Sequence, residues 1–301
     1  MINELEMNEV EILLKDTKYE KFIGFIYPIE LKGYVYKDLY KMGNDNIGYF
    51  ALKLRSSNRS DVVESIKTLK TLSDPEGFIN KYNDIFEKNG FLIMISNWLN
   101  GIQPIDGSNR KFLPEFFSKL ALLNKNNIAK GHFTSMYADG NYFDTINELA
   151  DYEINYHKNY FKDFVEIKYI AEVLNVLKHG MAAIILEDMN TGNLFLTKEG
   201  KYKFIDAEWI INGLNLYQFE KINYFGFEEK EWYNINEEAK ECYKAYFETL
   251  GTKFCEANEQ IRAFELLQVL RKNTYLKYYG KDNDDEIKRR IKTVMEKEKY
   301  I

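Results

Sequence analysis

The chain has 301 residues, which exceeds the usual size of one domain, so we expect one large domain or two lobes that share a cleft. Hydrophobic residues make up 45% of it and charged residues 29%, as in ordinary globular proteins, which excludes wholesale disorder. The formal net charge of -6 gives no general attraction to nucleic acids or anionic membranes, so neither is an expected partner.

The beginning of the chain carries carboxylates every few residues and lacks the basic end and apolar run of a signal peptide. No apolar stretch reaches the roughly 20 residues that span a bilayer. The two cysteines, Cys242 and Cys255, have neither CxxC spacing nor a histidine cluster beside them, which argues against a disulfide scaffold or a zinc site. We therefore expect a cytoplasmic protein with two unpaired thiols.

Strand-like runs predominate up to about residue 100. Three of them, at 21–31, 34–42 and 47–55, follow one another with turn residues before the third, which predicts an antiparallel meander. The apolar spacing of 62–72 then predicts one helix, and the apolar run at 91–97 predicts a further buried strand. Residues 101–111 are expected to form a loop.

Helical patterns prevail beyond this loop, at 114–125, 142–161 and 164–180, and three more follow from about residue 236. The fold class is therefore predicted as α+β, with an antiparallel-sheet lobe at residues 1–97 and a mainly helical lobe at 98–301.

The stretch 181–209 interrupts the helical pattern, because its apolar runs alternate around a turn at Glu199 and Gly200. If a two-residue turn closes this hairpin, Asn193 stands directly opposite Asp206, with Cβ atoms about 4.5–5.5 Å apart. An amide oxygen beside a carboxylate suits a hard cation such as magnesium. The sequence therefore predicts that Asn193 and Asp206 bind Mg²⁺, whereas a three-residue turn would shift the register and remove this pairing.

Asp188 lies five residues before Asn193, in the loop that follows the apolar run 182–186 and enters the hairpin. Phosphoryl transfer needs a carboxylate that orients the attacking hydroxyl and takes its proton, while metal ions neutralise charge on the transferred group. We therefore predict Asp188 as the catalytic base of a phosphotransfer site.

The pattern D-x-x-x-x-N at 188–193, followed by Ile-Asp-Ala-Glu-Trp at 205–209, resembles the protein-kinase-like small-molecule kinases, in the style of aminoglycoside phosphotransferases and choline kinases. The resemblance covers roughly residues 30–230 in the order of elements, and its motif identity is confined to 186–209. It implies a protein-kinase-like bilobal fold, with a nucleotide-binding lobe at 1–97 and with the catalytic loop and acceptor site at 98–301. ATP or GTP, together with Mg²⁺, is the implied cofactor.

Two neighbouring residues depart from this family pattern. Leu186 and Glu187 stand where the family has His-Gly or His-Asn, and that histidine normally supports the catalytic loop. This departure leaves an altered loop or a kinase without activity as open alternatives.

The run Phe-Ala-Leu-Lys-Leu at 50–54 resembles the Val-Ala-Ile-Lys strand of kinases, which implies that Lys53 reaches the α- and β-phosphates. A solvated strand lysine is the alternative. Glu64 is the first candidate for its acidic partner, but its helical phase and its spacing from Asp61 favour a helix-capping role. The partner of Lys53 therefore stays open.

The segment 92–101 resembles the family hinge Leu-Leu-Met-Glu-Trp-Leu-Pro-Gly, which implies that the Asn97 carbonyl and the Leu99 amide hold adenine. A plain buried strand is the alternative. A glycine-rich phosphate loop is not evident, because the first hairpin region offers only Gly33.

Glu208 and Trp209 follow the predicted metal ligand, and an acid beside an aromatic ring suits a cationic acceptor. The segment 225–238 adds further acidic and aromatic residues, although such mixtures also occur on solvated faces. We expect an ATP- and Mg²⁺-dependent kinase that acts on a hydroxyl of a small molecule, with an aminoglycoside, choline or an amino sugar as candidate acceptors. A pseudokinase, a nucleotide-binding interaction protein without turnover, and a kinase acting on a protein are the alternatives.

Overall fold

The computed structural model describes residues 5–31, 34–58, 60–102, 112–135, 141–160, 167–189, 191–225, 237–280 and 284–296. The chain forms two compact units, one made of Met1–Ile102 and Leu194–Trp209, the other of Gln103–Asn193 and Ile210–Ile301. The first unit thus includes a hairpin segment that the sequence placed in the helical lobe. Each unit is described by itself.

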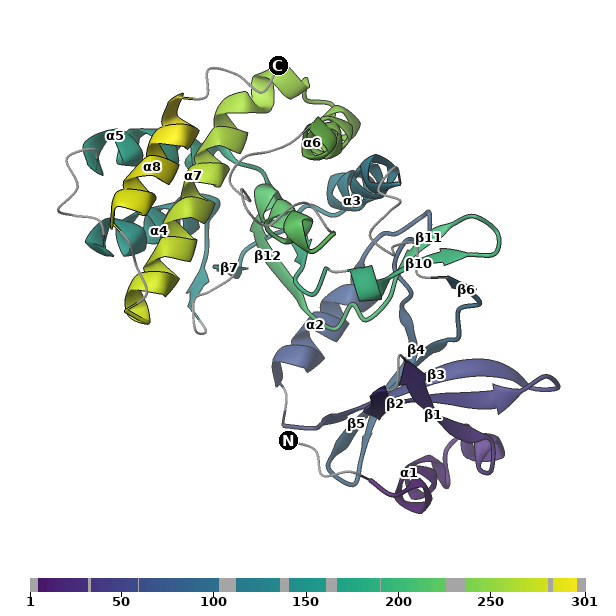
Figure 1. The fold of residues 1–301 in the computed structure, drawn as a ribbon. Helices are drawn as coiled ribbons and strands as arrows, with labels where there is room; N and C mark the ends of the chain where they lie inside the picture. The colour runs from purple at the N-terminus through teal and green to yellow at the C-terminus, as the bar shows by residue number, and fades with distance from the viewer. Residues whose placement is uncertain are drawn as a thin grey trace. The chain divides into compact units, whose positions relative to one another are not determined.

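The first unit contains a five-stranded antiparallel sheet in the order β1-β2-β3-β5-β4 (Figure 1). The expected meander and the single helix after it are confirmed, and two elements that the sequence did not predict, α1 and β4, complete this part. The elements are α1 (Met7–Leu14), η1 (Glu20–Phe22), β1 (Ile26–Leu31), β2 (Tyr34–Asn44), β3 (Gly48–Ser56), α2 (Ser60–Thr71), β4 (Tyr82–Lys88) and β5 (Phe91–Asn97).

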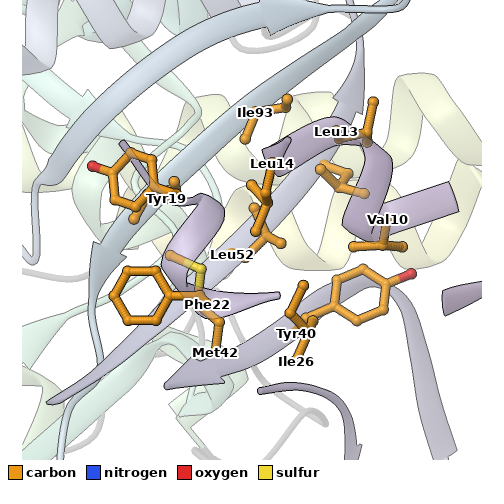
Figure 2. Packing of buried hydrophobic residues seen from close by; sticks show 12 residues of the cluster. Val10, Leu13, Leu14, Tyr19, Phe22, Ile26, Tyr40, Met42, Leu52 and Ile93 are labelled. Carbon is orange, nitrogen blue, oxygen red and sulfur yellow. The ribbon is translucent and has the colours of Figure 1, made fainter. Parts of the chain in front are cut away.

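The core of the first unit forms where α1 packs against one face of this sheet. Figure 2 shows Val10, Leu13 and Leu14 of α1 gathered with Leu52 and Ile93 of the sheet. The spacing of the three α1 residues places them on one helical face, and all five side chains are buried. Because side chains alternate along a strand, burying Leu52 on this face directs its neighbours in β3 to the other face.

A smaller sheet of three strands, in the order β11-β10-β6, also belongs to the first unit. Its strands are β6 (Gly101–Ile102), β10 (Leu194–Thr197) and β11 (Tyr202–Phe204). The Phe204 amide donates to the Phe78 carbonyl at 2.8 Å, and the Asn80 amide donates to the Phe204 carbonyl at 2.8 Å. These bonds fix the end of β11 just before Asp206.

The register of this hairpin corrects the predicted two-residue turn. Leu194 pairs with Phe204, and the Thr197 amide donates to the Lys201 carbonyl at 2.9 Å, so three residues form the loop. A two-residue hairpin turn of the preferred type needs positive φ at both central residues, whereas three-residue loops need one left-handed residue. Gly200 has a φ of 74° and supplies that residue. Asn193 is therefore not directly opposite Asp206, and the register argument for a shared magnesium site is wrong.

The second unit is mainly helical, as expected, around a four-stranded sheet in the order β8-β7-β12-β9. Figure 1 shows α3 beside α6, and α4, α5, α7 and α8 grouped together. The elements are α3 (Leu113–Asn126), β7 (Phe133–Thr134), β8 (Tyr142–Phe143), α4 (Ile146–Tyr160), α5 (Ile167–Leu174), η2 (Asn175–His179), β9 (Ala182–Leu186), η3 (Thr191–Asn193), β12 (Ile210–Leu214), η4 (Asn215–Phe225), α6 (Glu237–Leu250), α7 (Phe254–Tyr278) and α8 (Asp284–Glu296). In the described residues no helix has the length and apolar character to span a bilayer.

Stacked aromatic rings fill much of the core of this unit. The Phe219 ring lies 3.9 Å from the Tyr243 ring and 4.7 Å from the Phe117 ring, centroid to centroid, and all three side chains are buried. Part of the high aromatic content of the chain is therefore core packing.

Candidate functional site

The second unit brings Asp188 and Asn193 together. The Asn193 side-chain amide donates to the Asp188 carbonyl at 2.8 Å and to its carboxylate oxygen Oδ2 at 2.9 Å. Asp188 is exposed, but its neighbours Leu186 and Met189 are each only 1% exposed. The turn after β9 is thus anchored by apolar side chains on both sides of an accessible carboxylate.

Leu186 occupies the position at which the family pattern has histidine. It is the last residue of β9 and pairs with Ile210 of β12, so it lies inside the sheet that supports the turn. Apolar packing supports the start of the loop here.

The first unit contains the partners of Lys53 that the sequence left open. Lys53 lies in β3 between Leu39 and Met94 of the neighbouring strands. Its ammonium contacts the Asp206 carboxylate and lies 3.1 Å from Oε1 of Glu208. Glu208 is 155 positions after Lys53 in the chain. The side chain of Glu64, for which we predicted a capping role, lies outside the described residues.

Asp206 adopts an uncommon backbone conformation, with a φ of 62°. A non-glycine residue in this left-handed region costs roughly 1–2 kcal/mol, although aspartate is among the residues that tolerate it. The surrounding structure holds it there, because Phe204, two residues before it, and Ala207, directly after it, are buried. This conformation places the carboxylate beside Lys53.

Glu208 is enclosed by two cations. The Arg55 Nε lies 3.0 Å from Oε1 and 3.2 Å from Oε2 of Glu208, and Nη2 lies 2.6 Å from Oε1. Arg55 also contacts the Asp38 carboxylate. The sequence reasoning missed Arg55, although its position two residues after Lys53 puts both side chains on one face of β3.

Trp209 and Tyr82 pack against apolar side chains of the same unit. Both pack against a buried cluster between α2 and β5, made of Val62, Ile66, Leu92 and Met94. The Tyr82 hydroxyl is buried and has no hydrogen-bond partner among the described residues. Burial raises the pKa of Tyr82 well above its usual value, and the negative charges of Asp206 and Glu208 raise it further, so the phenol stays neutral.

The predicted adenine-binding hinge ends β5. The Asn97 carbonyl accepts a hydrogen bond from the Asn80 side-chain amide at 3.1 Å, and its side-chain oxygen accepts one from Asn83 at 2.6 Å. The Trp98 amide donates to the Tyr49 carbonyl, and Leu99 follows half-buried. The backbone around Asn97 is therefore held from both sides.

The chemistry of the predicted metal ligands suits magnesium. The Asn193 amide nitrogen donates both hydrogen bonds to Asp188, so the amide oxygen is the atom that could bind a cation. Asp206 has a carboxylate for the same purpose. Within the described parts of the chain, no three histidine, cysteine, aspartate or glutamate side chains gather in a group that could hold a metal. A Mg²⁺ bound through one or two protein oxygens, substrate phosphates and water needs no such group.

Two other parts of the sequence considered above fall on residues that the structure does not describe. Gly33, the glycine of the first hairpin region, in which no phosphate loop was evident, is one of them. Most of the acidic and aromatic segment 225–238 is the other, since residues 226–236 lie outside the described ranges.

No protein-family model and no curated protein sequence matches the chain. Solved structures do match. An ethanolamine kinase of Plasmodium vivax has a TM-score of 0.58 at 14% identity, covering 96% of this chain and 85% of that chain. An aminoglycoside phosphotransferase of Alicyclobacillus acidocaldarius has a TM-score of 0.54 at 10% identity, covering 92% of both chains.

A thermostable mutant of aminoglycoside phosphotransferase APH(4)-Ia, in ternary complex with ADP and hygromycin B, has a TM-score of 0.55. It is 13% identical, over 91% of this chain and 95% of that chain. Identities this low show the fold alone. The chain has the fold of the protein-kinase-like small-molecule kinases.

Proposed function

We propose that this chain is an ATP- and Mg²⁺-dependent phosphotransferase that phosphorylates a hydroxyl group of a small molecule. The observation that carries the proposal is the contact between Lys53 and Asp206, on a fold shared with small-molecule kinases. The sequence assigned these two residues separately, one to the nucleotide phosphates and one to the metal. Their contact in the first unit supports a common role.

Each residue has a distinct task in this reaction. Lys53 binds the α- and β-phosphates, and Asp206 and Asn193 hold Mg²⁺, which neutralises charge on the transferred phosphoryl group. Asp188 orients the acceptor hydroxyl and takes its proton. The hydrogen bond from the Asn193 amide to Oδ2 holds the Asp188 carboxylate in one orientation for that task.

The nucleotide base is proposed to bind along the end of β5. The Asn97 carbonyl and the Leu99 amide are the backbone groups assigned to it. Lys41 lies over the Tyr49 ring at 3.8 Å and the Trp98 ring at 5.1 Å, so aromatic side chains gather next to this backbone. Either ATP or GTP remains compatible with this assignment.

The proposed acceptor is a hydroxyl compound that also carries an amine or quaternary ammonium group, such as an aminoglycoside, choline or an amino sugar. The similar structures include a kinase of ethanolamine and a complex with hygromycin B, which supports this class. Trp209 and the segment 225–238 are the residues proposed to supply its aromatic and acidic contacts. Glu208 was predicted as a further acceptor contact, but its burial between Lys53 and Arg55 favours a different task.

The decisive experiment replaces the proposed base. Asp188→Ala should lower ADP production by roughly 10²- to 10⁴-fold across a panel of amine-bearing alcohols, because a general base contributes about that much. Nucleotide binding, measured by calorimetry, should stay within about twofold, since a charge lost from an exposed turn perturbs packing little. Asp151→Ala is the matched control, because Asp151 is a half-exposed aspartate of the same unit and should keep activity. Unchanged turnover in Asp188→Ala would contradict the proposal.

A second candidate is a pseudokinase or nucleotide-binding interaction protein without turnover. Leu186 and Glu187, in place of the histidine-containing pair, are the observation that favours it. Nucleotide-induced thermal stabilisation without ADP production from any acceptor would support this candidate. Protein substrates belong in the same panel, since phosphate transfer to them alone would indicate a protein kinase.

A further inference from the structure

Lys53 contacts two carboxylates that differ sharply in their surroundings. The Asp206 side chain is 28% exposed, whereas that of Glu208 is 2% exposed. A carboxylate that binds a metal and its hydration water must be accessible, and only Asp206 meets that condition. Glu208 is placed for a task that needs no solvent.

Glu208 is held in place by a second cation, because Arg55 donates hydrogen bonds to its carboxylate. Three hydrogen bonds join the guanidinium to the two carboxylate oxygens, and such forked pairs are strong and directional. Arg55 is held in turn by Asp38 on the neighbouring strand. Glu208 thus presents Oε1 to Lys53 from a rigid support.

The charges around Lys53 explain why it has two carboxylate partners. Lys53, Arg55, Asp38, Asp206 and Glu208 comprise two cations and three carboxylates, so the group carries one net negative charge. When Asp206 binds a divalent cation, Lys53 loses that partner and would be left as an unpaired, nearly buried ammonium without Glu208.

We infer that Glu208 is the positioning residue of Lys53: clamped by Arg55, it holds the ammonium in place while Asp206 exchanges Lys53 for Mg²⁺. The inference rests on the proposed function and deepens it. It makes Glu208 the acidic partner of Lys53, which the sequence left open, in place of an acceptor contact. Glu208 acts through Lys53 and does not touch the acceptor.

The test is nucleotide binding by Glu208→Gln, which keeps the shape of the side chain and removes its charge. With Mg²⁺ present, ADP affinity measured by calorimetry should weaken by about tenfold to hundredfold, the range expected for losing a charged hydrogen bond. In EDTA the loss should be smaller, because Asp206 then remains a partner of Lys53. The KM for nucleotide should rise in step, while the KM for acceptor stays within twofold. Glu199→Gln, at the exposed tip of the β10–β11 loop, is the control that should change neither.

A double-mutant cycle separates positioning from a general structural effect. Lys53→Met alone should weaken ADP binding, and adding Glu208→Gln to it should have little further effect, because both act through one ammonium. Equal losses in the two backgrounds would overturn the inference. If Glu208→Gln fails to fold, Arg55→Gln with Glu208→Gln removes both charges of the buried pair and takes its place in the cycle.

The outcomes also distinguish this inference from the proposed function. A wild-type protein that transfers phosphate while Glu208→Gln binds nucleotide normally would overturn the inference alone. A rise in acceptor KM with unchanged nucleotide affinity would do the same and restore Glu208 as an acceptor contact. A wild-type protein that binds no nucleotide would overturn both.

Discussion

The Asp206 carboxylate contacts the Lys53 ammonium, and in the proposed reaction the same carboxylate binds Mg²⁺. The proposal thus assigns two cations to one side chain, the Lys53 ammonium without nucleotide and Mg²⁺ with it. Its left-handed backbone conformation costs free energy, which is characteristic of sites where position decides function. At the scale of the residue, the proposal therefore depends on the carboxylate of Asp206.

Asp206→Asn should remove most of the dependence of nucleotide binding on magnesium. Wild-type protein should bind ADP more tightly with Mg²⁺ than with EDTA, and the variant should show about the same affinity in both, because a neutral amide is a weak Mg²⁺ ligand. Calorimetric titration in the two buffers measures this ratio. Asparagine tolerates the positive φ of this position, so the substitution should leave the backbone conformation unchanged. A variant that keeps the full magnesium effect would exclude Asp206 as the metal ligand.

At the scale of elements, the β10–β11 hairpin determines where Asp206 lies. Its three-residue loop depends on Gly200, whose φ of 74° is readily accessible to glycine. A Cβ atom at this position would meet no other atom within 4 Å, so the only obstacle to a side chain is the backbone conformation.

Gly200→Ala should therefore lower the free energy of unfolding by about 1 kcal/mol, the cost of a left-handed conformation for alanine. Gly200→Asn should cost less, since asparagine adopts this conformation more easily than alanine. Urea denaturation of both variants measures the difference. Equal stability of Gly200→Ala and wild type would indicate that the loop has a different conformation in solution.

Gly101 provides a contrasting case in the neighbouring strand. A Cβ atom there would lie 2.3 Å from the Leu196 carbonyl oxygen, so any side chain would push β6 away from β10. Here glycine is required by the close approach of two backbones, whereas at Gly200 it is required by φ.

At the scale of the whole molecule, stability in acid depends on a buried ionic group in the second unit. Oε1 of Glu153 in α4 lies 3.0 Å from Nη2 of Arg271 in α7 and accepts hydrogen bonds from Ser135 and Tyr217, both at 2.6 Å. Burial alone would raise the pKa of the Glu153 carboxyl, but Arg271, His157 and Ser135 lower it to about 2. This group connects several elements through one carboxylate.

The lowered pKa of Glu153 predicts how stability responds to acid. Because the folded state holds this group ionised below its ordinary pKa of 4.5, its contribution is present above that pH and is lost as pH falls toward 2. Glu153→Gln should lower the free energy of unfolding at pH 7 by about 3 kcal/mol, since removing one partner leaves a buried charge uncompensated. The difference from wild type should shrink at pH 3, as measured by urea denaturation.

Glu286 of α8 is the control for this prediction. Its pKa is also lowered to about 2, by Arg289 and Arg290, but its side chain is 34% exposed. Solvent screens such surface pairs, so Glu286→Gln should change stability much less at either pH. A loss as large as that of Glu153→Gln would show that burial is not the deciding factor.

Most of the fold follows from local patterns in the sequence. Strand alternation, helical spacing and turn residues predicted the meander, the helix after it and the helical second part, because these signals depend on neighbours a few positions apart. Hairpin patterning singled out Asn193 and Asp206, whereas Lys53 and the role of Asp188 depended on the resemblance to kinases. Local patterns did not reveal β4 or α1, whose places depend on the sheet they complete.

The tertiary structure alone decided the register of the hairpin and the place of Glu208. A turn of two or three residues differs by the conformation of one backbone position, which the sequence at Glu199 and Gly200 leaves open. In the sequence, Glu208 is an acid next to an aromatic residue. Only the folded unit shows that it contacts Lys53 and Arg55 of β3, which are 155 and 153 positions away along the chain. The sequence determined which groups are available for the proposed phosphate chemistry. Long-range packing determined which of them meet, because burial and charge pairing depend on neighbours far away along the chain.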